Sequence, residues 1–429
     1  MIVEQLVEKA MRKAQAAQAV VRQTESTEVK FEKDRLKATQ TSQRTQIELK
    51  VIVDGRIGSS SGTDPEDLDG IVARALETAP FGREATFAFP SPQECPQVKV
   101  YDERVVGAST AEMVAIGEEI VARVNDYNAD ILIDAGIGKD SGRIDLANSA
   151  GTTLTSKDTD FGAEVEGVLV RGTDVLYTEH AMGGKQRDLD HGAFAQEIIH
   201  YFRLAENLAP MESGDLPVIL TPAAAAILLL PLYLGLDGKN VLLGSSPLAD
   251  SQGRRIADSR FSLVDDPLVD FAAGSSPFDG EGVPRKRTPL IEQGVVANFL
   301  YDLDTASRAG AQPSGHGPNR RPTNLLIAPG DTSYEEMVKS IGRGLLVHEV
   351  LGLGQGNAIS GDFSVNVQLG YKIENGEIVG RVKDVMLAGN IYDALQDIAA
   401  IGDTPQWRVG YFSGAFPYIQ LGKLSVVAG

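Results

Sequence analysis

The stretch Thr45-Gln-Ile-Glu-Leu-Lys-Val-Ile-Val-Asp-Gly55 decides how the first half of the chain folds. Apolar side chains occupy every second position from Ile47 to Val53, mostly between charged neighbours. A period of two is typical of a strand with one buried face. The Asp54-Gly55 pair that follows favours a tight turn into a second strand. The stretch therefore predicts an antiparallel sheet.

The residues upstream of this stretch predict one more strand and a helix. Val29 and Phe31 alternate with charged neighbours, as in a half-buried strand. Before them, apolar residues recur at a spacing of three and four, which predicts one helix over residues 3–21. The apolar stripe of this helix consists of Val3, Leu6, Val7, Ala10, Met11, Ala14, Ala17 and Val21.

Two later helices carry start signals. Asp64, with Pro65 at the first helical position, predicts a helix that continues through residues 68–79. Ser109 and Glu112 form a capping-box pattern ahead of a helix over residues 113–124. Short strand patterns follow at residues 131–135, 143–146 and 161–171. Because strands and helices are grouped unevenly, the first half is predicted to be α+β with an antiparallel sheet.

The second half begins after a segment rich in turn-forming residues, Asn207–Asp215, which we interpret as a linker. A strongly apolar helix is predicted from Thr221 to Leu236, and Asn375-Gly376 is a strong hairpin signal. Short strands are predicted at residues 217–220, 295–301, 324–327, 345–350, 368–373 and 377–382. We therefore expect an N-terminal α+β domain over residues 1–211 and a mainly β, barrel-like domain over residues 212–429.

Composition limits the classes of function. The chain has 429 residues with 40 Lys and Arg against 59 Asp and Glu, a formal net charge of −19 that disfavours nucleic-acid binding. No window approaches the roughly 20 apolar residues that span a bilayer, and no signal-peptide pattern is present at the start. A single cysteine, Cys95, excludes an intrachain disulfide. We expect a soluble, cytoplasmic protein.

His348-Glu349 is the first candidate for metal chemistry. In a helical His-Glu-x-x-His motif two imidazoles hold zinc, but the second histidine position is Gly352 here, and the surroundings predict a strand. One imidazole cannot hold a catalytic zinc ion, so a structural role at a strand end is favoured. The other histidines show no spacing of three or four, and we expect no metal site. They are His180, His191, His200 and His316.

Other motifs favour structural interpretations. The glycine-rich Gly352–Gly356 lacks the spacing and the following helix of a dinucleotide-binding loop. No nucleophile elbow is present, and Ser314-Gly-His316 is more typical of a turn than of a serine–histidine pair. Five acidic residues could form a paired-acid site, but we favour a solvated loop whose negative charge is balanced by the basic residues Arg285–Arg287. These acids are Asp265, Asp266, Asp270, Asp279 and Glu281.

An ordered series of motifs in the second half resembles the TldD/PmbA family, in particular its PmbA (TldE) branch. Asn148–Gly151 and the opening helix are similar to the family too, so the resemblance spans nearly the whole chain. The motifs of the second half are Asp237–Asp250, Val264–Pro267, Ser276–Val283, Thr305–Arg308, Ser314–Gly317, Gly344–Gly352, Gly361–Ser364, Ile373–Glu377 and Leu387–Asn390.

The resemblance implies a heterodimeric cytoplasmic zinc metalloprotease that trims unstructured peptides, in a family also named modulator of DNA gyrase. In the TldD branch, a helix after the linker carries His-Glu-x-x-x-His, completed by a distal cysteine. The equivalent helix here is Ala223–Leu236, with Leu229, Leu230 and Leu234 at the His, Glu and second His positions. Alkyl side chains cannot bind zinc. The resemblance therefore implies no cofactor in this chain and zinc in a TldD-like partner.

Two functions remain open. The favoured one is a noncatalytic subunit that shapes a peptide channel around a TldD-like partner and offers strand edges to an extended peptide. The alternative is a stand-alone, homodimeric peptide-binding or hydrolytic protein. The same four residues are the candidates for its site and for a peptide groove, because they lie in glycine-rich segments where exposed polar groups are expected. They are His316, His348, Asp362 and Asn390.

Overall fold

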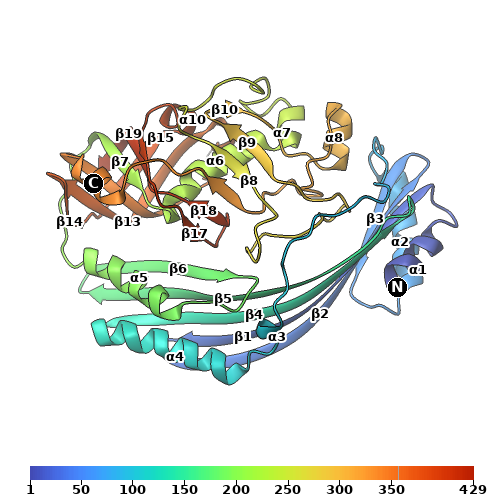
Figure 1. Ribbon diagram of the computed structural model, residues 1–429, viewed down its shortest axis with the longest axis horizontal. Coiled ribbons are helices and arrows are strands. Elements are labelled where there is room, and N and C mark those ends of the chain that lie inside the picture. Colours follow the sequence, from blue (N-terminus) through green and yellow to red (C-terminus); the bar gives the residue numbers. More distant parts are fainter. Residues whose placement is uncertain (356) are drawn as a thin grey trace.

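The computed structural model describes residues 1–355 and 357–429, and its first half is one long antiparallel sheet with strand order β3-β2-β1-β4-β5-β6. Figure 1 shows this sheet as a curved band that runs beneath the second half of the chain. Its strands are β1 (Ala16–Glu32), β2 (Arg35–Val53), β3 (Arg56–Gly62), β4 (Ile131–Asn148), β5 (Thr153–Arg171) and β6 (Asp174–Gly184). The predicted antiparallel sheet is confirmed.

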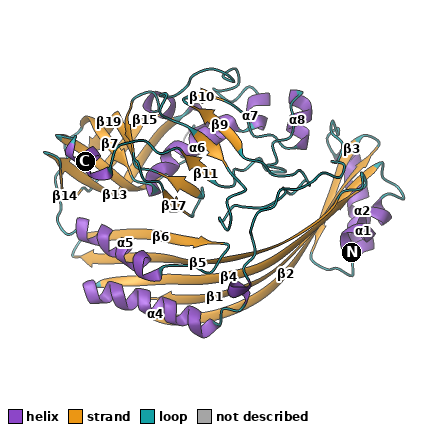
Figure 2. Cartoon of the chain, viewed as in Figure 1, coloured by secondary structure: helices purple, strands orange, loops and turns teal. Residues whose placement is uncertain are grey.

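The longer helices cover the sheet near its two ends, as Figure 2 shows. At one end α1 (Ile2–Ala10) and α2 (Leu68–Thr78) pack on the apolar side chains of β1 and β2. At the other end α4 (Thr110–Tyr127) and α5 (His191–Leu204) pack on β4 and β5. The capping box that Ser109 and Glu112 predict is present at the start of α4. Two shorter elements are η1 (Ala79–Phe81) and α3 (Glu103–Val106).

The middle of the sheet is polar, and this explains where the predicted strands were too short. Residues 138–145 of β4 are all partly exposed without alternation, and the helix that packs against this strand here is the short α3, whose Val106 carbonyl accepts from Lys139 Nζ. The pattern predicted strands over residues 131–135 and 143–146, and it missed residues 136–142, which join them in β4. For the same reason, residues 161–171 are only the second half of β5.

Two predicted boundaries of the first half are wrong. The helix predicted over residues 3–21 ends at Ala10, and β1 begins at Ala16. Residues 17–21 are buried on both faces of the sheet, so their apolar side chains fit a helical spacing without forming one. The N-cap of α2 is Asp67 rather than Asp64, and its carboxylate accepts a hydrogen bond from the backbone N–H of Gly70.

The second half contains a closed five-stranded barrel. The barrel-like class predicted for this half is therefore confirmed. The strands follow the order β12-β7-β19-β15-β13, and pairing between β12 and β13 closes the ring. They are β7 (Gly214–Leu220), β12 (Arg343–Leu351), β13 (Asp362–Glu374), β15 (Val385–Asn390) and β19 (Ile419–Ala428), to which β14 (Glu377–Arg381) and β16 (Ile398–Ile401) are added. Asn375 and Gly376, both at positive φ, form the predicted hairpin turn between β13 and β14.

A smaller sheet of short strands lies beside the barrel, in the order β10-β9-β8-β11-β18-β17. It consists of β8 (Leu263–Asp265), β9 (Thr288–Glu292), β10 (Val295–Val296), β11 (Leu325–Ile327), β17 (Gln406–Arg408) and β18 (Gly414–Phe416). The strand predicted over residues 295–301 therefore ends at Val296. The chain then leaves the edge of this sheet toward the helix that begins at Leu303.

The helices of the second half are short except for α6 (Ala226–Leu236), which is apolar on all sides because it is buried in the main core. The others are η2 (Ala223–Ala225), α7 (Gly238–Leu242), α8 (Leu303–Ala309), α9 (Tyr334–Lys339), η3 (Ala358–Ser360) and α10 (Ile391–Ala394). Among the described helices, none combines the length and the apolarity that a membrane crossing requires.

One hydrophobic cluster joins the two halves. Phe202 of α5 and Ile133 of β4 belong to the same buried cluster as Leu346 of β12 and Tyr371 of β13. The Tyr371 hydroxyl donates a hydrogen bond of 2.9 Å to the backbone carbonyl of Tyr201 on α5. The barrel is therefore seated on one end of the long sheet, and residues of both halves meet there.

Candidate functional site

A cavity of about 580 Å³ lies where the barrel meets the long sheet. The long-sheet side contributes residues of β5, β6 and α5, and the other side contributes α6, β12, β13 and the segment around Arg408. Its apolar lining includes Phe194, Leu229, Leu353, Phe412 and Phe416, and its polar lining includes Glu164, Glu179, His180, Glu197, His348, Glu349 and Arg408. The cavity thus combines an apolar wall with a set of titratable groups.

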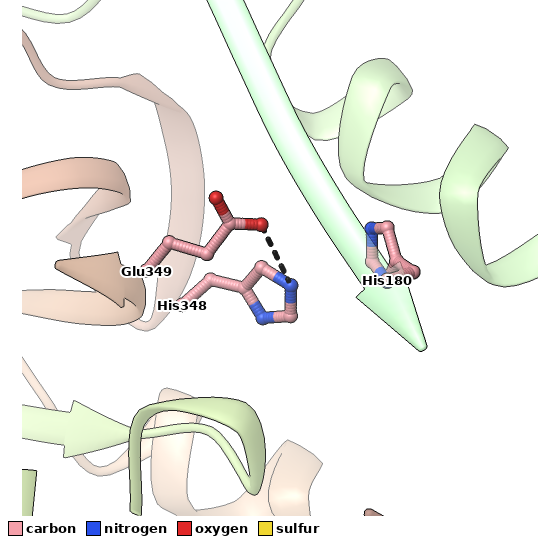
Figure 3. A group of neighbouring side chains, drawn as sticks. All are labelled: His180, His348 and Glu349. Atoms are coloured by element: carbon pink, nitrogen blue, oxygen red, sulfur yellow. Dashed lines mark ion pairs between the residues drawn. The ribbon is translucent and has the colours of Figure 1, made fainter. Parts of the chain in front are cut away.

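Three of these residues form a compact polar cluster, His180, His348 and Glu349, shown in Figure 3. One possible ligand atom from each lies within 4.8 Å of the others. His180 comes from β6 of the long sheet, and the other two come from β12 of the barrel. The cluster therefore spans the junction between the two halves of the chain.

A β-bulge explains how two consecutive residues of β12 reach one cavity. Neighbours on a regular strand point to opposite faces. The register between β12 and β13 shifts on both sides of Glu349, and His348 is left out of the pairing. The extra residue turns the strand locally, so His348 and Glu349 both line the cavity.

The His348 imidazole stacks on the Tyr201 ring and is hydrogen-bonded through one nitrogen only among the described residues. Its Nδ1 lies 3.1 Å from the Thr221 hydroxyl, which also accepts a hydrogen bond from the backbone N–H of Ala224. Its Nε2 is buried and has no hydrogen-bond partner among the described residues. The nearest carboxylate oxygen, Glu349 Oε1, is 3.8 Å away, along the dashed line in Figure 3. That distance is too long for a hydrogen bond.

The other two residues of the cluster share Thr178 of β6. The Thr178 hydroxyl donates to Glu349 Oε1 at 2.6 Å, and the backbone N–H of Glu179 donates to the same oxygen at 3.0 Å. His180 Nε2 lies 3.0 Å from the Thr178 hydroxyl oxygen. Because the single hydroxyl proton goes to Glu349, His180 Nε2 donates this bond, and the lone pair of the ring is on Nδ1.

Burial controls the charge of the cluster. It lowers the pKa of His180 to about 3, with a further contribution from Arg408, and it holds the pKa of His348 well below the usual range. Both imidazoles are therefore neutral at pH 7 and can offer a lone pair. Burial also raises the pKa of Glu349 to about 7, although hydrogen bonds from Thr178 and Glu179 oppose this.

The residues predicted to line a groove do not come together. His348 lies in the cavity, but it is buried in a strand rather than exposed in a loop. Asp362 and Asn390 face each other across β13 and β15, and the Asn390 amide donates to the Asp362 carboxylate at 2.9 Å. Asp362 is exposed and Asn390 is half-buried, and neither lines the cavity.

His316 is buried, contrary to the expectation that it is exposed. Its Nδ1 is 2.9 Å from Ser314 Oγ, and its Nε2 is 2.7 Å from Asp265 Oδ2. This is the order of a catalytic triad, but the Ser314 hydroxyl already donates to the backbone carbonyl of Tyr301 and accepts from its N–H. A serine without solvent access and with its proton committed cannot act as a nucleophile, so the arrangement is structural.

The acidic segment predicted to be a solvated loop is largely buried, so that prediction is wrong. Asp265, Asp279 and Glu281 are each at most 3% exposed. Asp279 accepts from backbone N–H groups, including that of Gly317, and Glu281 accepts from the N–H of Leu303. These carboxylates organise the surrounding loops: Asp279 satisfies three backbone donors, and Glu281 and Asp265 satisfy one each, that of Leu303 and that of Thr323.

The three leucines at the degenerate zinc-motif positions lie on α6. Leu229 is buried and lines the cavity, whereas Leu230 and Leu234 are half-buried. Their side chains carry no nitrogen, oxygen or sulfur atom, so they do not fit a zinc ion. The glycine-rich segment predicted not to bind a dinucleotide, Gly352–Gly356, includes one position outside the described residues. Within it, Gly352 and Gly354 have positive φ.

Comparisons with known proteins agree with the fold. A family model described as the PmbA/TldA metallopeptidase C-terminal domain matches residues 213–428, and the model of domain 1 matches residues 17–79. The structure of TldE from Thermococcus kodakarensis superposes with a TM-score of 0.91 at 22% identity, covering 100% of both chains. This structural likeness shows that the two proteins share a fold.

Relatives of known sequence include an uncharacterized protein of Methanocaldococcus jannaschii, which is 28% identical over 378 residues, 84% of this chain and 85% of that protein. Metalloprotease PmbA of Escherichia coli is 32% identical over 208 residues, 48% of this chain and 45% of that protein. The match to PmbA thus spans about half of each protein. Since one family model alone covers half of the chain, the chain belongs to the PmbA/TldD metallopeptidase family.

Proposed function

We propose that this chain is a TldE/PmbA-like subunit of a TldD/TldE-type zinc metalloprotease system that acts on unstructured peptides. In this proposal the hydrolytic zinc ion is held by a TldD-like partner, and the complex works in the cytoplasm. One observation carries it: α6 presents Leu229 to the cavity, and the motif positions on this helix contain alkyl groups only. Such groups can bind substrate by apolar contact but cannot activate water.

The surroundings of the cavity support a peptide as the ligand. Phe194 and Phe412 give it an apolar wall, and Glu179 and Glu349 add hydrogen-bond acceptors. Strand β17 ends the smaller sheet, and its Arg408 lines the cavity. An extended peptide can add to such an edge through backbone hydrogen bonds, which depend little on its sequence. This mode suits substrates without a fold of their own.

The test is to mix the purified chain with a His-Glu-x-x-x-His partner from the same genome and to follow cleavage of a fluorogenic unstructured peptide. We expect no cleavage by this chain alone and cleavage by the mixture. A Glu→Gln change in the partner's motif is expected to abolish the activity. Chelator-sensitive cleavage by this chain alone, at the rate of the mixture, would overturn the proposal.

A pair of matched variants examines the role of the cavity. Tyr411 lies at its edge with 60% of its surface exposed, so Tyr411→Ser is expected to preserve the fold and to raise the KM of the complex several-fold. Phe81 is also an exposed aromatic, at 91%, but does not line the cavity, and Phe81→Ser is expected to leave KM unchanged. Equal effects of the two substitutions would exclude the cavity as the peptide site.

The second candidate is a stand-alone homodimer that binds or hydrolyses peptides without a partner. The observation that favours it is the cluster of His180, His348 and Glu349 in the same cavity, because these groups are of the kind that hydrolases use. This function predicts a dimer of this chain in light-scattering measurements and peptide cleavage by that dimer. A monomer without cleavage activity would exclude it.

A further inference from the structure

We infer that His180, His348 and Glu349 form a binding site for a divalent first-row transition ion, with Zn²⁺ as the first choice. Two imidazole nitrogens and one carboxylate oxygen are a ligand set that zinc commonly takes, with a fourth position left for water or another oxygen. The ion would join β6 of the long sheet to β12 of the barrel. The inference does not depend on the proposed function, because none of these residues lies on α6.

The distances are close to those that a metal ion requires. Ligand atoms at tetrahedral positions around zinc lie about 3.4 Å apart, as follows from bond lengths near 2.0–2.1 Å. The three residues offer atoms within 4.8 Å of one another, and His348 Nε2 is 3.8 Å from Glu349 Oε1. Small rotations of the side chains, of roughly 1 Å at the ligand atoms, would therefore complete the site.

The His348 ring points to a missing ligand. Its Nε2 is buried without a partner among the described residues, and an unpaired buried acceptor is costly. If Nδ1–H donates to Thr221, the free electron pair of the ring lies on Nε2, the atom nearest Glu349. Metal-binding histidines usually donate their other N–H in this way, because the bond fixes the tautomer and the ring orientation.

The other two candidate ligands, Glu349 and His180, are also oriented by a threonine hydroxyl, that of Thr178. The Thr178 hydroxyl binds both Glu349 Oε1 and His180 Nε2, which leaves His180 Nδ1 with a lone pair and the second oxygen of the carboxylate, Oε2, free to take the place of Oε1 toward His348. Two threonines, one from each half of the chain, thus orient all three candidate ligands. Such support is what distinguishes a prepared metal site from a chance meeting of polar residues.

The local charge also favours a cation. Glu164 and Glu179 line the same cavity, so two further carboxylates lie near the three candidate ligands. The guanidinium of Arg408, which also lines the cavity, donates to Glu197 at 2.6 Å. A divalent ion would reduce the repulsion among the carboxylates, and it could enter through the cavity.

The experiment titrates the purified, metal-free full chain with Zn²⁺ in a calorimeter and with Co²⁺ in a spectrophotometer. We expect one equivalent of each ion to bind, with the visible absorption of four- or five-coordinate Co²⁺. Removing one ligand by His348→Gln or His180→Gln is expected to weaken binding at least about 100-fold. Thr221→Val, which keeps all three ligands, is expected to weaken it by about 10–100-fold.

His191→Gln is the matched control, because it removes a histidine of α5 that lies outside the cavity and leaves the expected affinity unchanged. Circular dichroism of each variant identifies any that fail to fold. If the histidine variants do not fold, the affinity of Thr221→Val for the ion tests the site, since this substitution changes no ligand. Absence of stoichiometric binding, or equal affinity in His348→Gln, Thr221→Val and wild type, would overturn the inference. The assay uses no partner and no peptide, so its outcome is separate from that of the proposed function.

Discussion

Replacing Asp265 with asparagine tests whether the buried arrangement around His316 is structural. The Asp265 carboxylate is fully buried and accepts three hydrogen bonds. They come from His316 Nε2 at 2.7 Å, the backbone N–H of Thr323 at 2.6 Å and the Thr323 hydroxyl at 2.8 Å. An asparagine of similar size would keep one acceptor oxygen and would place an amide donor against a donor.

The size of the effect follows from these contacts. A hydrogen bond to a charged group contributes about 1.5–3 kcal/mol, and the substitution disturbs the bonds to one of the two carboxylate oxygens, for a loss of about 3–5 kcal/mol in total. Unfolding entropy is about 2.1 cal/mol/K per residue, which gives roughly 0.9 kcal/mol/K for a chain of 429 residues. Asp265→Asn is therefore expected to lower Tm by about 3–6 °C.

Calorimetry measures this change, and Ser314→Ala provides the comparison. It removes one neutral hydroxyl, so we expect a loss of about 1–2 kcal/mol, or about 1–2 °C. Because the serine is structural, Ser314→Ala is expected to leave any peptide cleavage by the complex unchanged, and a fluorophosphonate probe is expected not to label the chain. A Tm unchanged in Asp265→Asn, or labelling at Ser314, would refute the reasoning.

Three further predictions concern packing, pH and a buried ion pair. A Cβ at Gly117 of α4 would lie 2.2 Å from the Phe31 ring, so Gly117→Ala is expected to destabilise by roughly 1–2 kcal/mol in urea unfolding, despite the helix preference of alanine. The backbone N–H of Ser109 is the main cause that lowers the pKa of Glu112 from 4.5 to about 2. This stabilisation is present above pH 4.5 and lost as the pH falls toward 2, so Glu112→Gln is expected to be less stable than wild type at pH 6 and equal to it near pH 2. Arg320 bridges two buried aspartates, and Arg320→Met is expected to cost about 3–5 kcal/mol, whereas an unchanged Tm would contradict that role.

Features set by neighbouring residues were predictable from the sequence. The turn at Asn375-Gly376 depends on two residues that accept positive φ, and both have it. The capping box of Ser109 and Glu112 is equally local, and it begins α4 as predicted. The α+β class followed because these local signals occur in an uneven order along the chain.

Features set by distant contacts were not predictable. The alternation that marks a strand exists only where one face is buried and the other exposed, and residues 138–145 of β4 are all partly exposed. The acids at Asp279 and Glu281 have the composition of a solvated loop, yet they are buried because backbone donors from distant segments converge on them. Composition does not reveal where those donors are.

The polar cluster of His180, His348 and Glu349 was not predictable from the sequence for two reasons. A search for metal ligands by sequence spacing detects sets on one element, whereas His180 and His348 belong to strands of different sheets. Even for the adjacent pair, a regular strand places His348 and Glu349 on opposite faces, and only the bulge in β12 brings both to the cavity. The bulge adds one residue to β12 without a partner in β13, so it is a property of the pairing and not of either strand alone. A candidate site of this kind becomes visible only once the barrel has closed and rests on the long sheet, which places Thr178 and Thr221 on either side of the same two imidazoles.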